Sequence, residues 1–277
     1  MKEISSYSDL LFQDDSIWFS QKNETKIHYP EQGNSIFSQI EGKSFWYIHR
    51  NNVIIEIIKK HINPKSIFFE IGGGNGYVLS KIKDEGFDCV MLEPDLNGIL
   101  IAQKRGINNL ICSNFYDACF KNNTIPNIGI FDVLEHIEDE NMFLKSLFNS
   151  LEINGKLIIT VPAYNFLWSD EDNHDGHFRR YNIKNISELL IKHGFKIDYK
   201  SYFFSVLPIP IFILRTIPTF LKIKRNYSVE TYQKENTIDN TFLMSLLKKI
   251  WELEISFFKK DKKIRFGGSI LIVASKS

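Results

Sequence analysis

The chain has 277 residues, of which 43% are hydrophobic and 24% charged, so it can bury a large core as one domain, with or without an insertion. Its formal net charge of +1 provides no overall positive field, and nucleic acid is not an expected partner. A cytoplasmic protein is expected, because the three cysteines lack CxxC spacing, the first residues do not resemble a signal peptide, and no apolar run of about 18 residues could span a bilayer.

Residues 1–65 begin with irregular sequence and continue into an amphipathic helix through "FWYIHRNNVIIEIIKKHI". We predict that this segment is a helical cap. Trp46 and Arg50 lie four residues apart and therefore share one face of the helix, where they can act together. The alternative for Trp46 is an ordinary place in the core.

From Ser66 onward, short β-prone runs alternate with segments of helical period. The predicted helices cover residues 77–86, 96–106, 138–151 and 185–194. The predicted strands are "SIFFEI", "FDCVMLE", "NLICS", "NIGIFDV", "KLIITV", "FKIDYKSYFF" and the final "SILIVASK". This alternation predicts an α/β core over residues 66–203 and 265–277, with a parallel sheet covered by helices on both faces.

Residues 204–264 interrupt this pattern as a predicted helical insertion, apolar and basic, before the last strand. Its first half, "FFSVLPIPIFILRTIPTFLKIKR", is apolar, and Pro208 and Pro210 disfavour a continuous helix there. Its second half is helical and basic. The cations of the insertion include Lys222, Lys224, Arg225, Lys259, Lys260, Lys262 and Lys263. Two interpretations stay open: an element that lies in an anionic membrane interface or holds a lipid-linked phosphate, and a helical lid that buries its apolar face.

A glycine loop follows the first strand of the core. Gly72, Gly74 and Gly76 have the spacing G-x-G-x-G at a strand-to-helix turn, where backbone N–H groups can approach a ligand closely. Glu93 ends the next strand about twenty residues later, where an acid can accept hydrogen bonds from both hydroxyls of a ribose. A tight structural turn without a ligand is the alternative.

These motifs resemble those of class I S-adenosylmethionine-dependent methyltransferases. "FFEIGGGNG" and "VMLEPD" are similar to the first two motifs of that family, "FDVLEHIEDE" to the stretch after its fourth strand, and "GKLIITVPAY" to its fifth. The resemblance covers about residues 41–203 and the final strand. It implies a Rossmann-like, seven-stranded, mostly parallel sheet whose antiparallel last strand inserts beside the sixth, and S-adenosylmethionine as the cofactor.

The resemblance also implies the roles of individual residues. Glu70 would lie near the methionine amino group and Glu93 on the ribose, while Asn114 and Phe115 would flank the adenine. The cofactor-binding set that follows is Glu70, Gly72, Gly73, Gly74, Asn75, Gly76, Glu93, Pro94, Asn114, Phe115, Asp132, Val133 and Arg50. The fourth strand of the family often opens with Asp but reads "NIGIFDV" here, so Asp132 is expected to carry more of the polar role. Arg50 is expected near the methionine carboxylate or the acceptor.

The loop "VPAYNFLWSDEDNHDGHFRRY" follows the fifth strand, at the edge of the sheet where open α/β sheets bind ligands. It resembles a branch of the family with the motif VPAxxxLWSxxDxxxGHxRRY, which often has FWxxxRN upstream. That branch is commonly associated with the assembly of cell-surface polysaccharide or lipid-linked sugars. The resemblance implies O-methylation of a sugar or of a lipid-linked or cell-surface glycan intermediate. A nucleotide sugar or a metabolite with a carboxylate or phosphate is the alternative acceptor.

An oxygen acceptor requires a base, and His177 is the predicted one because imidazole titrates near neutral pH, with Asp172 as its orienting partner or as the alternative base. Arg179 and Arg180 are predicted to bind an anionic group of the acceptor. The alternative for the two arginines is ion pairing with acids of the same loop. Tyr181 is expected to pack rather than react.

A metal site is a further hypothesis for this loop, since His174 and His177 lie three residues apart among carboxylates, but no metal is expected. His136 is predicted either to pack behind the site or to contact the cofactor or acceptor. The "FDVL" turn and the lack of a Pro-Cys pair disfavour nucleic-acid methylation. The remaining alternative from another class is a binding scaffold with the same fold but no catalysis.

Overall fold

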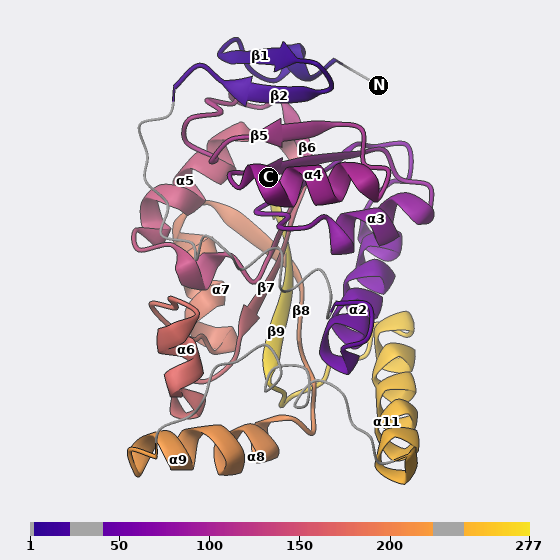
Figure 1. Ribbon diagram of the computed structural model, residues 1–277, viewed down its shortest axis with the longest axis vertical. Coiled ribbons are helices and arrows are strands. Elements are labelled where there is room, and N and C mark those ends of the chain that lie inside the picture. Colours follow the sequence, from indigo (N-terminus) through magenta and orange to yellow (C-terminus); the bar gives the residue numbers. More distant parts are fainter. Residues whose placement is uncertain (1–2, 23–40, 224–240) are drawn as a thin grey trace.

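Parallel strands form the centre of the sheet, as the alternation of strands and helices predicts (Figure 1). The computed structural model describes residues 3–22, 41–223 and 241–277. Its strands are β1 (Leu11–Asp14), β2 (Ile17–Ser20), β3 (Phe68–Ile71), β4 (Cys89–Glu93), β5 (Leu110–Cys112), β6 (Ile125–Phe131), β7 (Leu151–Pro162), β8 (Phe195–Phe203) and β9 (Ser269–Lys276). The order is β1-β2-β5-β4-β3-β6-β7-β9-β8, and β9 is antiparallel to both neighbours. The predicted Rossmann-like sheet with an inserted antiparallel last strand is confirmed.

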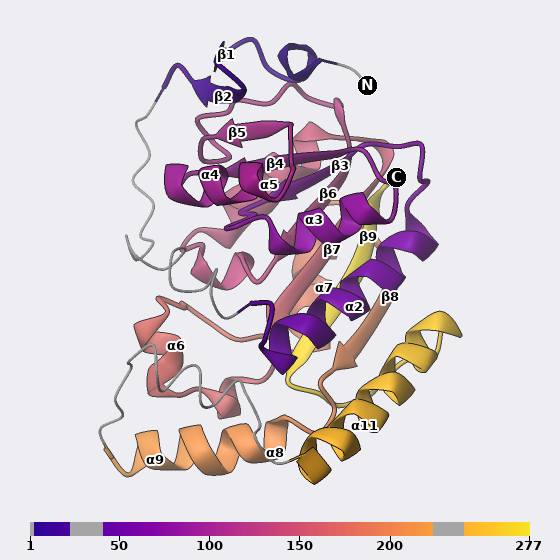
Figure 2. The ribbon, with the colours of Figure 1, turned by 45° about the vertical axis from the view of Figure 1, so that its right-hand side comes forward.

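Helices cover both faces of this sheet (Figure 2). They are α2 (Phe45–His61), α3 (Tyr77–Asp84), α4 (Leu96–Lys104), α5 (Glu140–Ser150) and α7 (Ile183–Lys192). Phe68 of β3 belongs to the apolar cluster of α2, α3 and α4, whereas Phe69 belongs to the cluster of α5 and α7. Successive side chains of a strand point to opposite faces, so a strand buried on both sides reads as the continuous apolar run seen in "SIFFEI".

The sheet has nine strands in the described residues, not the seven expected from the resemblance. The extra two, β1 and β2, form an antiparallel hairpin, and β2 pairs in parallel with β5 and extends that edge. Asp15 at the turn adopts a φ of 53°, a conformation that Asp and Asn tolerate better than most residues. Tyr7, just before the hairpin, packs edge-on against Phe69, with ring centroids 4.8 Å apart. Residues 1–65 therefore contribute strands as well as the predicted helix.

The first half of the insertion is helical, in agreement with the predicted helical insertion, and its prolines do not prevent this. It runs through α8 (Pro208–Ile211), the π-helical η4 (Phe212–Thr216) and α9 (Ile217–Phe220). Pro208 and Pro210 fall in the first turn, where a helix needs no donor from them. Pro218 lies just after the π-helical turn. The altered backbone hydrogen bonding of that turn accommodates the missing N–H donor of the proline. Lys224 and Arg225 lie outside the described residues.

The second half of the insertion, α11 (Thr241–Lys259), packs beside α2 in both views (Figures 1 and 2). Glu254 of α11 is buried and accepts hydrogen bonds from the backbone N–H of Phe204 at 3.0 Å and of Ser205 at 2.6 Å. Its carboxylate also lies 2.8 Å from Nε2 of buried His49 on α2. One carboxylate thus joins the N-terminal helix, the end of β8 and the insertion. Among the described residues, no helix combines the length and apolar character needed to cross a membrane.

Glu254→Ala should lower the free energy of unfolding by about 3 kcal/mol, because it leaves His49 and two backbone donors buried without their acceptor. Urea denaturation followed by circular dichroism measures this. Glu252→Ala is the matched control, since Glu252 is exposed on the same helix. Equal midpoints for the two variants would show that the buried carboxylate does not hold α11 in place.

Candidate active site

The glycine loop connects β3 to α3 in a backbone conformation that requires glycine. Gly72 and Gly76 have φ values of 72° and 68°. A Cβ at Gly72 would lie 2.8 Å from Cγ2 of Val133, and one at Gly76 would lie 2.6 Å from Cδ1 of Ile107. The loop is therefore pressed against the turn after β6 and against the residues that follow α4. Within the loop, buried Asn75 donates to Glu41 through Nδ2 at 3.3 Å. The backbone carbonyl of Asn75 accepts a hydrogen bond from Arg105 at 3.0 Å.

Glu93 ends β4 with its carboxylate turned to the glycine loop. Its Oε2 accepts from the N–H of Gly74 at 2.8 Å, and its Oε1 accepts from the N–H of Asp95 at 3.0 Å. Burial raises the pKa of Glu93 to about 7, although both backbone donors oppose the shift. Pro94, next in the chain, is exposed. A ligand that donates further hydrogen bonds to Glu93 would stabilise the ionised carboxylate. The hydroxyls of a ribose can be such donors.

Glu70, Arg50 and Asp132 form the polar centre beside the loop. The guanidinium of Arg50 on α2 pairs with Asp132, which follows β6 and also accepts from Thr160 at 3.2 Å. Burial alone would lower the pKa of Arg50, but Asp132 and Tyr47 raise it. Burial raises the pKa of Glu70 to about 8, against the opposing charge of Arg50. Oε2 of Glu70 is buried without a hydrogen-bond partner in the described residues, so the site has an acceptor ready for a cationic donor.

Trp46 packs on the same side as Arg50. The Arg50 guanidinium lies 4.8 Å from the centre of the Trp46 ring, and this ring stacks on Phe204. The two residues share one face of α2 and contact each other, as their spacing predicts. Trp46 supports Arg50 and also takes a place in the apolar packing, so the two interpretations of its role are compatible.

Asn114 and Phe115 follow β5 and are both buried. The Asn114 side chain accepts from the N–H of Asp117 at 2.8 Å and donates to its carboxylate. Phe115 packs against Phe143 of α5, with ring centroids 5.6 Å apart. The adenine role of these two residues stays a prediction. In this structure they shape the end of β5 through contacts with their own neighbours.

The loop after β7 is tied back to the sheet. It contains η3 (Asn165–Leu167) and α6 (Asp170–His174). Tyr164 donates its N–H to the carbonyl of Tyr181 at 2.6 Å, and Tyr181 donates to the carbonyl of Pro162 at 3.0 Å. Phe178 donates to the carbonyl of Glu135, in η2 (Leu134–His136) after β6, at 2.8 Å. The loop therefore has a fixed position against the turn that follows β6.

His177 and Asp172 are paired, as predicted. Nδ1 of His177 lies 2.8 Å from Oδ1 of Asp172, and Nε of Arg180 donates to the same oxygen at 2.7 Å. Burial alone would raise the pKa of Asp172, yet the hydrogen bond of His177 and the charge of Arg180 lower it to about 2. An ionised carboxylate only accepts, so Nδ1 of His177 donates in this contact, and Nε2 is the ring nitrogen left for other contacts.

Arg179 and Arg180 both form ion pairs within the protein. Arg180 makes the ion pair with a loop carboxylate that the sequence left open as an alternative. Arg179 pairs with Glu140 of α5 at 3.0 Å and donates to the carbonyl of Glu138 at 2.7 Å. Tyr181 is buried and donates to Glu140 at 2.7 Å, so it packs as expected. The predicted contact of Arg179 and Arg180 with an acceptor stays a prediction.

His136 lies beside His177, with the ring centroids 4.7 Å apart. Burial and the neighbouring His177 lower the pKa of His136 to about 4. Next to it, burial and Asp132 raise the pKa of Glu135. Sequence analysis assigned no role to Glu135. The signal that could have found it is its position three residues after Asp132, in a turn that follows a central strand.

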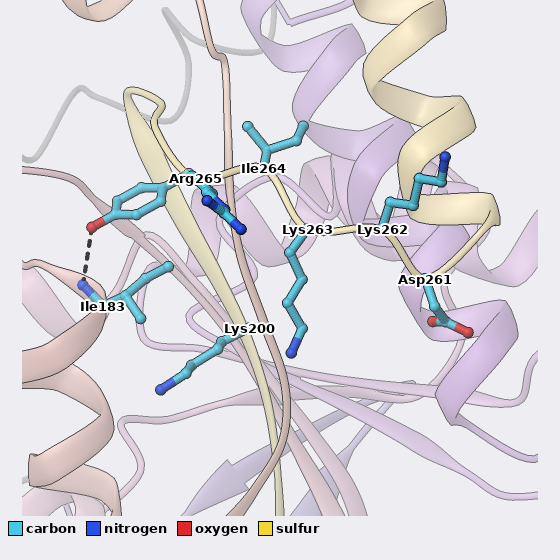
Figure 3. A pocket seen from close by; sticks show the side chains of 8 residues that line it. Ile183, Lys200, Asp261, Lys262, Lys263, Ile264 and Arg265 are labelled. Carbon is cyan, nitrogen blue, oxygen red and sulfur yellow. Dashed lines mark hydrogen bonds between the residues drawn. The ribbon is translucent and has the colours of Figure 1, made fainter.

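Two open grooves lie on the described surface. A groove of about 440 Å³ is lined partly by Asn165, Arg179 and Arg180. A second groove of about 620 Å³ lies between β8 and the segment after α11. Figure 3 shows Lys200, Lys263 and Arg265 around this second groove. Neither groove is lined by Glu70 or Glu93, so both are separate from the glycine-loop cradle.

Comparisons with known proteins agree with this geometry. A family model described as a methyltransferase domain matches residues 47–200, more than half of the chain, so the chain belongs to this family. One similar structure is a chain of the Haloferax volcanii complex that contains the Trm112 methyltransferase activator, at 11% identity over 91% of this chain and 99% of that one, with a TM-score of 0.59. No curated protein matches the sequence.

Two further structures share the fold. Phosphoethanolamine N-methyltransferase 2 of Haemonchus contortus, with phosphomonomethylethanolamine and S-adenosylhomocysteine, is 17% identical over 89% of this chain and 57% of its own, with a TM-score of 0.56. Geranyl diphosphate methyltransferase, in complex with GPP and sinefungin, is 11% identical over 81% of this chain and 78% of its own, with a TM-score of 0.52.

The family membership and the fold establish S-adenosylmethionine as the cofactor of this chain. The residues present fit it. Glu93 at the end of β4 can accept from ribose hydroxyls, and the buried, unpartnered Oε2 of Glu70 suits an ammonium group.

Glu93→Ala should weaken the binding of S-adenosylmethionine about ten- to hundredfold, or roughly 1.5–3 kcal/mol, through the loss of two charge-assisted hydrogen bonds. Isothermal titration calorimetry measures the affinity. Glu85→Ala, which removes an exposed carboxylate bonded to Lys59, is the matched control. A folded Glu93→Ala protein that binds the cofactor like the wild type would refute the assignment of Glu93 to the ribose.

Proposed function

We propose that this chain transfers the methyl group of S-adenosylmethionine to a hydroxyl oxygen of a sugar, in a lipid-linked or cell-surface glycan intermediate. The observation that carries the proposal is that the loop of His177 adjoins an exposed apolar helical surface, residues 208–223. We call these residues the apolar platform. An acceptor with a sugar and a lipid requires a polar transfer site and an apolar surface side by side.

Three contacts join the loop to the apolar platform. The N–H of Asp170 in α6 donates to Oγ1 of Thr219 at 3.0 Å. Glu171 pairs with Arg215. Phe166 of η3 meets Phe212 edge-on, with ring centroids 6.2 Å apart. Both views show α8 and α9 beneath α6, at the end of the molecule farthest from β1 (Figures 1 and 2).

The apolar platform exposes large side chains. Phe220 is 84% exposed and Leu214 is 65% exposed. The other exposed apolar residues of the platform are Ile209, Phe212, Ile213, Ile217, Leu221 and Ile223. A contiguous apolar surface of this kind marks a binding face, and a short amphipathic element suits a membrane interface. A lid that buries its apolar face would leave fewer of these side chains exposed, so the exposure supports the interfacial interpretation.

Exposed lysines suit an anionic lipid surface beside the apolar platform. Lys222 lies near the end of the platform, and Lys248 and Lys249 lie in the first half of α11. Both views place that half of α11 near α8, whereas Lys259 and Lys260 lie at the opposite end of the helix (Figures 1 and 2). The first group of lysines, not the second, therefore supports lipid contact. We propose a cytoplasmic protein with peripheral contact to the inner face of the membrane.

The methyl transfer depends more on the alignment of donor and acceptor than on catalytic groups of the protein. Methyl transfer from a sulfonium is an in-line displacement, so alignment of the acceptor and exclusion of water supply most of the rate. His177, with its Nδ1 held by Asp172, is the group to which the sequence assigns the removal of the hydroxyl proton. We propose that Arg180 holds Asp172 in place and that Arg179 holds the loop against α5.

A soluble acceptor is the second candidate. The cationic groove of Lys200, Lys263 and Arg265 could hold a phosphate or carboxylate, as in a nucleotide sugar. A scaffold without catalysis is disfavoured by the fit of Glu70 and Glu93 to the cofactor.

Labelled S-adenosylmethionine incubated with the protein and cell extract should transfer label to the organic-solvent fraction that contains lipid-linked sugars. His177→Ala should reduce the rate about 10²- to 10⁴-fold, the contribution of a positioned acid–base group. His174→Ala, three residues away and largely exposed, is the matched control. Label in the aqueous small-molecule fraction alone would favour a soluble acceptor, and no transfer at all would contradict the enzyme proposal.

The protein should float with anionic liposomes at low salt and dissociate at high salt. The double variant Phe220→Ser with Leu221→Ser should float less at either salt concentration, because it removes exposed apolar surface. Reversing the charges of Lys248 and Lys249 should weaken flotation more than reversing those of Lys259 and Lys260. Failure of the wild type to float in any condition would leave the soluble acceptor as the better proposal.

A further inference from the structure

Three side chains of types that can bind a metal ion lie close together at the loop after β7, which we call the acceptor loop (residues 163–181). Glu135 and His136 come from η2, and His177 comes from the loop after β7, more than forty residues later. Each offers one ligand atom, and these atoms all lie within 4.8 Å of one another. Ligands of one zinc-sized ion lie at about 2.1 Å from it. Small side-chain rotations would therefore bring all three onto a common centre.

The backbone fixes the two loops against each other. The N–H of Phe178, next to His177, donates to the carbonyl of Glu135 itself at 2.8 Å. The imidazoles of His136 and His177 already touch edge-to-face. A site assembled from two loops with a direct backbone link is pre-organised, so an ion would not have to draw distant segments together.

The second nitrogen of His177 has the support that metal-bound histidines usually have. Its Nδ1 is held at 2.8 Å by Asp172, which is itself fixed by Arg180. In metal sites the ring N–H that faces away from the ion typically donates to a carboxylate, which orients the ring and raises its ligand strength. Asp172 has this relation to His177, with Nε2 available for the ion.

Glu135 supplies an independent observation. Its side chain is 1% exposed, and its Oε2 makes no hydrogen bond within the described residues. A buried carboxylate oxygen without a partner is costly, and buried charges are normally paired or bound to a metal. Asp132 is not the missing partner, because its oxygens are engaged by Arg50 and Thr160.

We propose that Glu135, His136 and His177 bind one divalent transition-metal ion on the acceptor side of the site. Two imidazoles and a carboxylate favour zinc, manganese, iron or cobalt over magnesium or calcium, which prefer oxygen ligands. Three protein ligands leave a position open for water or for an oxygen of the acceptor, as in catalytic metal sites.

The ion changes the role of His177. As a ligand through Nε2, the ring does not accept the hydroxyl proton. An acceptor hydroxyl bound at the open position would have its pKa lowered by the ion, and its proton would pass to water as the oxygen takes the methyl group. The expectation from sequence that the loop binds no metal, which considered His174 with His177, did not include the η2 residues.

Metal binding is tested on the full chain without an affinity tag and without cofactor or acceptor. After treatment with chelator and its removal, equilibrium dialysis against Zn²⁺, and separately against Mn²⁺, should show one bound ion per chain for at least one of the two. Metal content is measured by plasma mass spectrometry. Glu135→Gln and His177→Ala should each lose most of this binding. Asp172→Asn should weaken it about ten- to hundredfold, the usual effect of losing a carboxylate behind a metal-bound histidine.

His174→Ala is the matched control, because this exposed histidine belongs to the same loop but not to the cluster. Thermal melting shows which variants are folded, and His177→Gln replaces His177→Ala if the latter is not. Failure of the wild type to bind either ion at a level near one per chain would overturn the proposal. Equal loss of binding in the His174 and His177 variants would overturn it too. Transfer of label by the metal-free protein would refute a role of the ion in the transfer and leave the proposed function intact.

Discussion

The buried guanidinium of Arg50 is the interaction on which the site depends. Four carboxylates, those of Glu70, Glu93, Asp132 and Glu135, are buried or nearly so at the ends of β3, β4 and β6. Arg50 neutralises part of this charge through Asp132 and lowers the cost of ionising Glu70. Without it, the acids would take up protons or the loops would separate, since buried like charges in low dielectric cannot all ionise.

This excess of buried acid explains why the cradle suits a cationic cofactor. With the pKa of Glu70 raised to about 8 and that of Glu93 to about 7, both carboxyls are partly protonated near neutral pH until a donor or a cation arrives. S-adenosylmethionine carries an ammonium and a sulfonium, and its product has lost the sulfonium charge. A site with surplus negative charge therefore favours the donor over the product, which helps product release.

The position of Arg50 is set by segments from both ends of the chain. His49, its neighbour on α2, binds Glu254 of the insertion, and Trp46 stacks on Phe204 at the end of β8. The predicted division into an N-terminal cap and a separate insertion is thus joined by direct contacts in the folded protein. The insertion that carries the apolar platform also holds the helix that carries Arg50, so the acceptor side and the cofactor side share one support.

Sequence patterns predicted the core because its strands and helices have clear periods and because glycine spacing reports local backbone geometry. The hairpin of β1 and β2 was missed since each strand has four residues, and its place at the sheet edge is set by long-range pairing with β5. The insertion was predicted to be helical, but its prolines were expected to disfavour a continuous helix over residues 208–220. They do not, because proline at a first turn, or beside a π-helical turn, loses its usual penalty. The meeting of His136 with His177 depends on tertiary contacts that no local pattern encodes.

The charges of the acceptor loop illustrate the same point in chemical terms. Its sequence shows acids and arginines that could bind an anionic acceptor, yet the fold pairs Arg180 with Asp172 and Arg179 with Glu140. Glu171 pairs with Arg215 of the platform. Once these pairs form, the groups left beside Glu135 are two imidazoles, which suit a neutral hydroxyl or a metal ion better than a phosphate. An anionic part of the acceptor would then be bound away from the reacting oxygen, and the cationic groove beside β8 lies apart from it.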